Sequence, residues 1–76
     1  MKPNKYMEIV EAGSSASGKT KIWHIKDKGS GEYLGRIFWW ARWSQYVMET
    51  DEGVIWAKSC LDYISDFIQQ QMEARR

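Results

Sequence analysis

The 76-residue chain has few of the side chains that build covalent or metal-bound sites, with one cysteine and one histidine. A single cysteine excludes an internal disulfide framework, and Cys60 with His24 falls short of the four ligands of a structural zinc site. The pattern places Cys60 on an apolar helix stripe and His24 on the far face of a sheet, too far apart for a nucleophile and its base. We therefore expect no metal, no cofactor, no catalytic residue and no enzymatic activity.

Long hydrophobic runs and an excess of one charge are also missing. No segment reaches the roughly 20 apolar residues of a membrane span, and the first ten residues contain no apolar run of signal-peptide type. Eleven Lys and Arg against ten Asp and Glu give a net charge of +1, which provides no general attraction to nucleic acid. We expect a cytoplasmic protein that does not contact a membrane.

The chain is rich in aromatic residues, and these concentrate in one stretch. Five tryptophans are present, and three of them lie in the segment RIFWWARWSQY at 36–46. A chain this short buries only about 60% of its unfolded surface, so large rings are an efficient way to build its single core. In residues 37–40 both alternate positions are apolar, whereas a half-buried strand needs one apolar face. The second face must be covered or must bind something.

Periodicity predicts one domain over residues 1–76, with disorder at 1–4, strands within 5–56 and a helix over 59–73. The expected strands cover 6–11, 21–26, 33–40, 45–50 and a short fifth segment, 54–56. Ser59 and Asp62 fit the helix-capping pattern S-x-x-D, and the apolar residues that follow recur at helical spacing. The expected fold class is α+β: an antiparallel meander of four to five strands with one C-terminal helix packed on one face. Trp23, Ile25, Ile37, Trp39, Tyr46 and Met48 would point toward the helix.

A resemblance supports this arrangement over residues 20 to 72. The residues that carry it are Trp23-His24-Ile25, the glycines at 29 and 31, LGRIFW at 34–39, Trp43, Tyr46, VIW at 54–56 and CLDYISDFI at 60–68. In this order they resemble a group of small proteins common in phages, prophages and plasmids. The resemblance implies a small strand-rich domain with a C-terminal helix. It implies no activity, so it assigns no functional residue.

The segment Gly13–Thr20 matches the phosphate-loop pattern G-x-x-x-x-G-K-[ST]. A true phosphate loop opens a helix, whose N–H groups hold the phosphates. Here the alternating, β-branched sequence KIWHIKDK follows, which predicts a strand. We interpret Gly13–Thr20 as a polar hairpin loop and expect no nucleotide binding.

The sheet face opposite the helix is the candidate binding surface. Its predicted members are Ile22, His24, Lys26, Arg36, Phe38, Trp40, Arg42 and Val47. The N-terminal residues could fold over it, a protein could cover it, or bases could stack on Phe38 and Trp40 while Lys26 and the arginines contact phosphates. We favour a protein–protein interaction module of phage or mobile-element type that forms a homodimer or inhibits a host protein. The alternative is a nucleic-acid-binding module that uses the same face.

Overall fold

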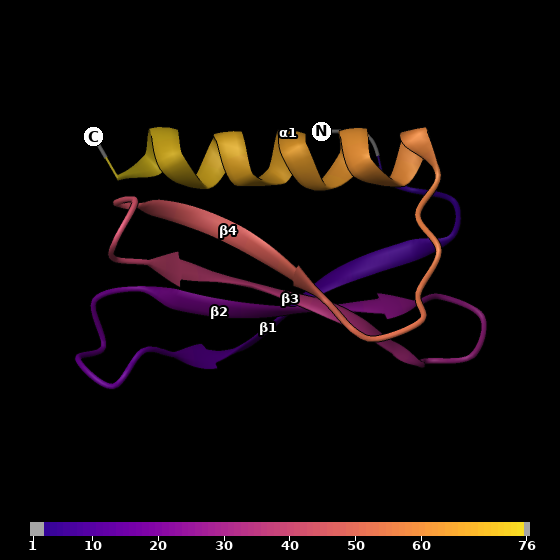
Figure 1. Cartoon of the computed structure of the whole chain (residues 1–76), viewed down its shortest axis with the longest axis horizontal. Helices are drawn as coiled ribbons and strands as arrows, with labels where there is room; N and C mark the ends of the chain where they lie inside the picture. Colours follow the sequence, from indigo (N-terminus) through magenta and orange to yellow (C-terminus); the bar gives the residue numbers. More distant parts are fainter. Residues whose placement is uncertain (1–2, 76) are drawn as a thin grey trace.

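The computed structural model describes residues 3–75, which form one antiparallel sheet and one helix (Figure 1). The elements are β1 (Met7–Ser14), β2 (Lys21–Asp27), β3 (Tyr33–Trp40), β4 (Gln45–Thr50) and α1 (Lys58–Ala74). The strands lie in the order β1-β2-β3-β4, so each pairs with its neighbour along the chain. The predicted α+β fold class is confirmed.

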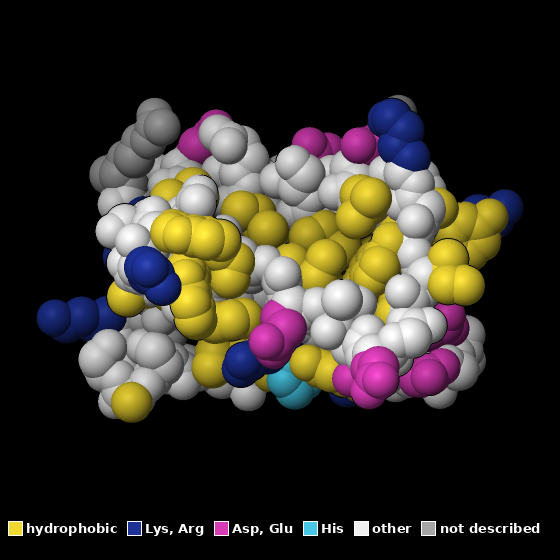
Figure 2. All heavy atoms as spheres, in the orientation of Figure 1, with side chains coloured by type: hydrophobic (Ala, Val, Ile, Leu, Met, Phe, Trp, Pro, Cys, Tyr) yellow, Lys and Arg dark blue, Asp and Glu magenta, His cyan; other side chains and the backbone are white. Residues whose placement is uncertain are grey.

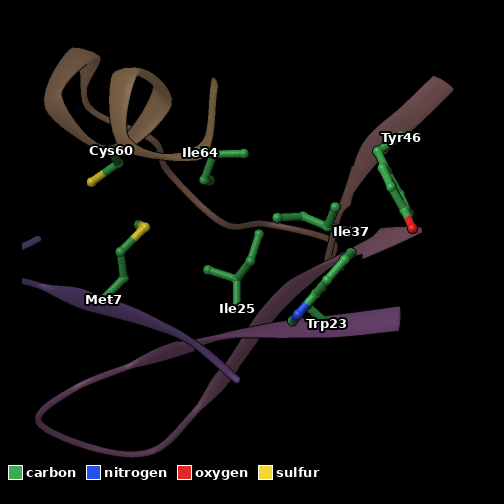
Figure 3. Close-up of a cluster of buried hydrophobic side chains, with 7 residues drawn as sticks. All are labelled: Met7, Trp23, Ile25, Ile37, Tyr46, Cys60 and Ile64. Carbon is green, nitrogen blue, oxygen red and sulfur yellow. The ribbon is translucent and has the colours of Figure 1, made fainter. Parts of the chain in front are cut away.

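The core lies between α1 and the sheet (Figure 3). Ile25 and Ile37 are fully buried at its centre. The other buried hydrophobic residues are Met7, Trp23, Tyr46, Cys60 and Ile64, with Trp39 and Met48 half-buried against them. Because Trp23 pairs with Ile37, and Ile37 with Met48, the predicted inward set shares one face of the sheet.

The β2–β3 hairpin is closed by the Asp27 carboxylate. Its Oδ1 accepts the backbone N–H groups of Gly29 at 2.8 Å and Ser30 at 2.9 Å. These donors favour the charged form, so they lower the pKa of Asp27 below its usual 3.8. Gly31, with φ of 75°, supplies the left-handed residue that completes the turn.

The predicted fifth strand at 54–56 is wrong. Residues 54–57 are irregular and pair with no described strand. The segment is instead held by a side chain, since Trp56 Nε1 donates to Thr50 Oγ1 at 2.7 Å. After the turn at Gly53 the chain must leave the sheet to reach α1, so its backbone cannot continue the ladder.

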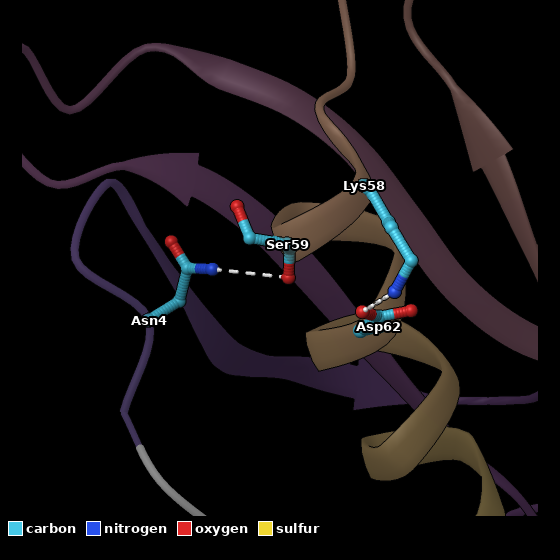
Figure 4. A network of polar contacts seen from close by, with 4 residues as sticks. All are labelled: Asn4, Lys58, Ser59 and Asp62. Atoms are coloured by element: carbon cyan, nitrogen blue, oxygen red, sulfur yellow. Dashed lines mark hydrogen bonds and ion pairs between the residues drawn. The ribbon is translucent and has the colours of Figure 1, made fainter.

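The predicted cap at Ser59 is also wrong, and the helix extends one residue beyond each predicted end. Ala57 is the N-cap and makes no side-chain cap hydrogen bond. Ser59 already lies within the first turn, and its carbonyl accepts Asn4 Nδ2 at 3.5 Å (Figure 4). Asp62 pairs instead with Lys58 at 2.7 Å, one helical turn away.

The predicted disorder at residues 1–4 is wrong for Asn4, and residues 1–2 lie outside the described part of the chain. Asn4 is buried, and its Oδ1 accepts the N–H groups of Tyr6 and Met7 at 2.8 and 3.2 Å. This hydrogen-bonded turn leads into β1, which pairs with β2 at the edge of the sheet. Residues 7–14 therefore do not fold over the face opposite α1.

Candidate protein-binding surface

The face opposite α1 collects seven of the eight residues predicted for the site. Strand alternation places Ile22, His24 and Lys26 of β2, Arg36, Phe38 and Trp40 of β3, and Val47 of β4 on this face. The register supports the assignment, because His24 pairs with Arg36 and Phe38 with Val47. Arg42 lies in the turn that follows β3.

Three aromatic rings form a row along β3 and into the β3–β4 turn. The ring centres of Phe38 and Trp40 are 6.1 Å apart, and those of Trp40 and Trp43 are 6.4 Å apart. Trp40 is 41% exposed and Trp43 is 64% exposed. We call Phe38, Trp40, Arg42, Trp43 and Val47 the aromatic patch. Together with Met48 and Glu49 of β4 they line an open hollow.

Hydrophobic side chains also reach the surface where α1 meets the strands. Figure 2 shows hydrophobic side chains gathered in a band across the middle of the view, between the helix and the lower strands. The band extends toward both ends of the molecule. Large contiguous apolar areas are uncommon on monomers, so the exposed apolar surfaces of this chain are candidates for contact with a partner.

Sequence reasoning did not assign Trp43 to the site. Residues 41–44 form a tight turn between β3 and β4. The N–H of Trp43 donates to the carbonyl of Trp40 at 3.1 Å, and Ser44 adopts a positive φ of 51°. This turn brings the Trp43 ring against Trp40. The sequence feature that indicates a surface role for Trp43 is its place in a four-residue turn, because a side chain in such a turn does not reach the core.

One of the cations on this face, Arg36, is neutralised within the chain. Arg36 Nε lies 2.9 Å from Glu49 Oε1, and the Arg36 guanidinium lies 4.1 Å from the Phe38 ring centre. Lys26 lies opposite Glu8 in the strand register and makes no ion pair among the described residues. Arg42 is a cation of the patch that also has no ion-pair partner within the described residues.

Four predicted site residues lie outside the hollow: Ile22, His24, Lys26 and Arg36. Ile22, His24 and Lys26 are on β2, and the His24 ring packs edge-to-face against Tyr33 at 5.0 Å. The sheet face thus has an aromatic half at β3–β4 and a mixed polar half at β1–β2. His24 and the buried Cys60 lie on opposite sides of the sheet, as predicted.

The loop within Gly13–Thr20 closes the β1–β2 hairpin. The N–H of Ser15 donates to the carbonyl of Thr20 at 2.8 Å, and that of Gly18 to the carbonyl of Ser15 at 2.9 Å. The antiparallel strand β2 follows directly, as predicted, so the loop does not open a helix. The arrangement that a phosphate loop requires is not formed.

Both edges of the sheet are blunted against strand pairing. On β4 the N–H of Tyr46 donates to Met72 Sδ of α1 at 3.4 Å, so the helix covers that end of the edge. On β1 the register shifts between Glu11 and Gly13, which marks a bulge. Covered edges and bulges are common protections against edge-to-edge association.

These features define a small α+β protein with a four-stranded meander, one face under a helix and an aromatic patch on the other. Over its whole length the chain is similar to an uncharacterised 9.3 kDa protein of Acholeplasma phage L2, with 29% identity over 76 residues that covers 100% of this chain and 96% of the phage protein. No protein-family model and no solved structure matches. Similarity to a small phage protein agrees with the predicted resemblance, whose finer sequence pattern stays a prediction. Within residues 3–75, no helix combines the length and hydrophobicity needed to span a membrane.

Proposed function

We propose that this chain is a non-enzymatic, cytoplasmic protein–protein interaction module whose aromatic patch is the contact surface. The observation that carries the proposal is the exposure of Trp40 and Trp43 on a sheet face that no other described element covers. Trp and Arg are the residues most enriched at the energetic centres of protein interfaces, and Arg42 stands beside both rings. Similarity to a phage protein supports a role in a phage or mobile element.

A protein partner is favoured over nucleic acid by the charges and ring geometry of the patch. Arg36, which could contact a phosphate, is paired with Glu49 and lies over one face of Phe38. Phe38 and Trp40 are nearly perpendicular, with 87° between the ring planes, so they do not offer two parallel faces to successive bases. The net charge of +1 adds little attraction to phosphates.

The nucleic-acid alternative is tested by fluorescence anisotropy with labelled single-stranded oligonucleotides at low and high salt. We expect no saturable binding at low salt. Binding that weakens steeply with salt and is lost in Arg42→Gln would favour the alternative, because phosphate contacts release counterions.

Site-specific photo-cross-linking tests the proposal. A photoreactive phenylalanine analogue replaces Trp43 in one variant, and replaces the exposed helix residue Gln70 in the control. Both variants are produced in a cell in which the protein acts. We expect a protease-sensitive adduct of discrete mass from position 43 and none from position 70. Equal labelling from both positions, or a nuclease-sensitive adduct, would contradict the proposal.

A further inference from the structure

Ile55 is an apolar residue that the fold holds in solvent. It is 94% exposed, although isoleucine is among the residues most often buried. Its neighbours explain why it cannot turn inward. Val54 is half-buried, and Trp56 packs against the core while its Nε1 donates to Thr50. With Trp56 held against the core and Val54 half-buried, the Ile55 side chain between them is left in solvent.

The segment that contains Ile55 is chemically complementary to the hollow of the aromatic patch. Asp51 and Glu52 precede Ile55, so the segment combines two carboxylates with a projecting apolar side chain. The hollow is lined mainly by rings and aliphatic groups. Arg42 is also in the lining and has no ion-pair partner among the described residues. The only carboxylate among the described lining residues, Glu49, is already paired with Arg36 at 2.9 Å. An acidic segment that enters the hollow would therefore meet the positive charge of Arg42.

The two features lie at opposite ends of β4. The hollow is at the β3–β4 turn, and Ile55 follows the end of the strand, whose six residues span about 20 Å. In Figure 1 the β3–β4 turn is at the left and the segment from β4 to α1 is at the right, and Figure 2 shows hydrophobic side chains at both ends of this view. If two copies of the chain are related by a two-fold axis near the middle of β4, the hollow of each copy faces the Ile55 segment of the other. Such a reciprocal contact closes a dimer.

We infer that the occupant of the hollow is a second copy of this chain. This inference rests on the proposed function and names the partner. Ile55 of each copy inserts between the rings of the other copy's aromatic patch, and Glu52 faces Arg42. The contact buries two otherwise exposed Ile55 side chains together with Trp40 and Trp43.

Sedimentation equilibrium on the full chain tests the inference, with samples up to the millimolar range. The wild type should form a species of twice the 9.0 kDa monomer mass. Ile55→Ser and Trp43→Ser should each weaken dimerisation about tenfold or more, because each removes a buried apolar contact from both halves of the dimer. Both side chains are exposed in the monomer, so their loss leaves the fold intact by circular dichroism. The matched control, Tyr6→Ser, replaces a 57% exposed ring outside the patch and should dimerise as the wild type does.

A charge exchange tests the pairing of the two segments. Arg42→Glu and Glu52→Arg should each weaken the dimer, and the double variant should recover it, because the reversed pair again carries opposite charges. A wild type that stays monomeric, or a dimer unaffected by Ile55→Ser, would overturn the inference. In either case a cross-linked adduct from position 43 to a different protein would leave the proposed function standing.

Discussion

Trp39 and Trp40 are neighbours in sequence on opposite faces of β3, so replacing each with serine separates core from patch. Trp39 packs edge-to-face against Tyr46 with ring centres 5.2 Å apart, and the Arg75 guanidinium lies 4.2 Å from its ring. Trp40 is 41% exposed and touches mainly the other patch rings. We expect Trp39→Ser to destabilise the protein strongly and Trp40→Ser to do so only slightly.

The magnitude for Trp39 follows from its partial burial. Truncating a core tryptophan costs about 3–5 kcal/mol, and Trp39 is half-buried, so the lower value of about 3 kcal/mol applies. The ring contact with Tyr46 and the cation–π contact with Arg75 each account for about 0.5–1 kcal/mol of this loss in stability. A domain of this length has a total stability of about 4–11 kcal/mol, so the variant loses a large share of it. For Trp40→Ser we expect about 1 kcal/mol or less, because the Trp40 side chain is itself exposed and lies outside the core.

Urea unfolding followed by circular dichroism measures both values, and unchanged slopes establish that the unfolded states are comparable. If Trp40→Ser destabilises the protein as much as Trp39→Ser does, the assignment of Trp40 to an exposed face outside the core is wrong. If Trp39 is the tolerant residue, the strand register is shifted by one and the two faces must be exchanged.

Three further variants test separate parts of the structure. Gly35→Ala should destabilise the fold by about 1–3 kcal/mol in urea unfolding, because its Cβ would lie 2.6 Å from the backbone oxygen of Glu49; a neutral result would contradict the packing of β3 on β4. Asp27→Asn should be less stable than the wild type at neutral pH. Because the folded state lowers the pKa of Asp27, the charged carboxylate stabilises the fold above pH 3.8, and this stabilisation is lost as the pH falls through the folded pKa. The difference in unfolding free energy between wild type and Asp27→Asn should therefore shrink in acid, and a difference that grows in acid would refute the prediction. Calorimetry with ATP and magnesium should give no binding heat, and magnesium-dependent binding that vanishes in Lys19→Ala would overturn the hairpin-loop interpretation.

Much of the fold could be predicted because local patterns and burial agree. Alternation over 33–40 and 45–50 coincides with β3 and β4, and the apolar stripe after residue 59 gives the body of α1. The errors fall where tertiary contacts replace local signals. Asn4 is ordered by N–H groups of Tyr6 and Met7 and by the distant Ser59 carbonyl, a contact between residues 55 positions apart that no local pattern indicates.

The candidate surface could be predicted only in part. Period-two alternation is enough to place Phe38 and Trp40 on the face away from α1. The position of Trp43 depends on a positive φ at Ser44, a conformation that sequence rarely signals for a non-glycine residue. The neutralisation of Arg36 depends on cross-strand pairing with Glu49, which requires the register of β3 on β4.

The central claim is that a protein covers Trp40 and Trp43, and ¹⁹F NMR of the 5-fluorotryptophan-labelled chain tests it most directly. The five tryptophans give five resonances, assigned by single Trp→Phe variants. The spectrum is recorded for the dimer, or for the complex with the protein identified by cross-linking. In that complex the Trp40 and Trp43 resonances should shift and lose their solvent-isotope effect. The resonances of Trp23 and Trp39, on the other face, should stay in place. Unchanged Trp40 and Trp43 resonances in a complex that shifts the others would contradict the account.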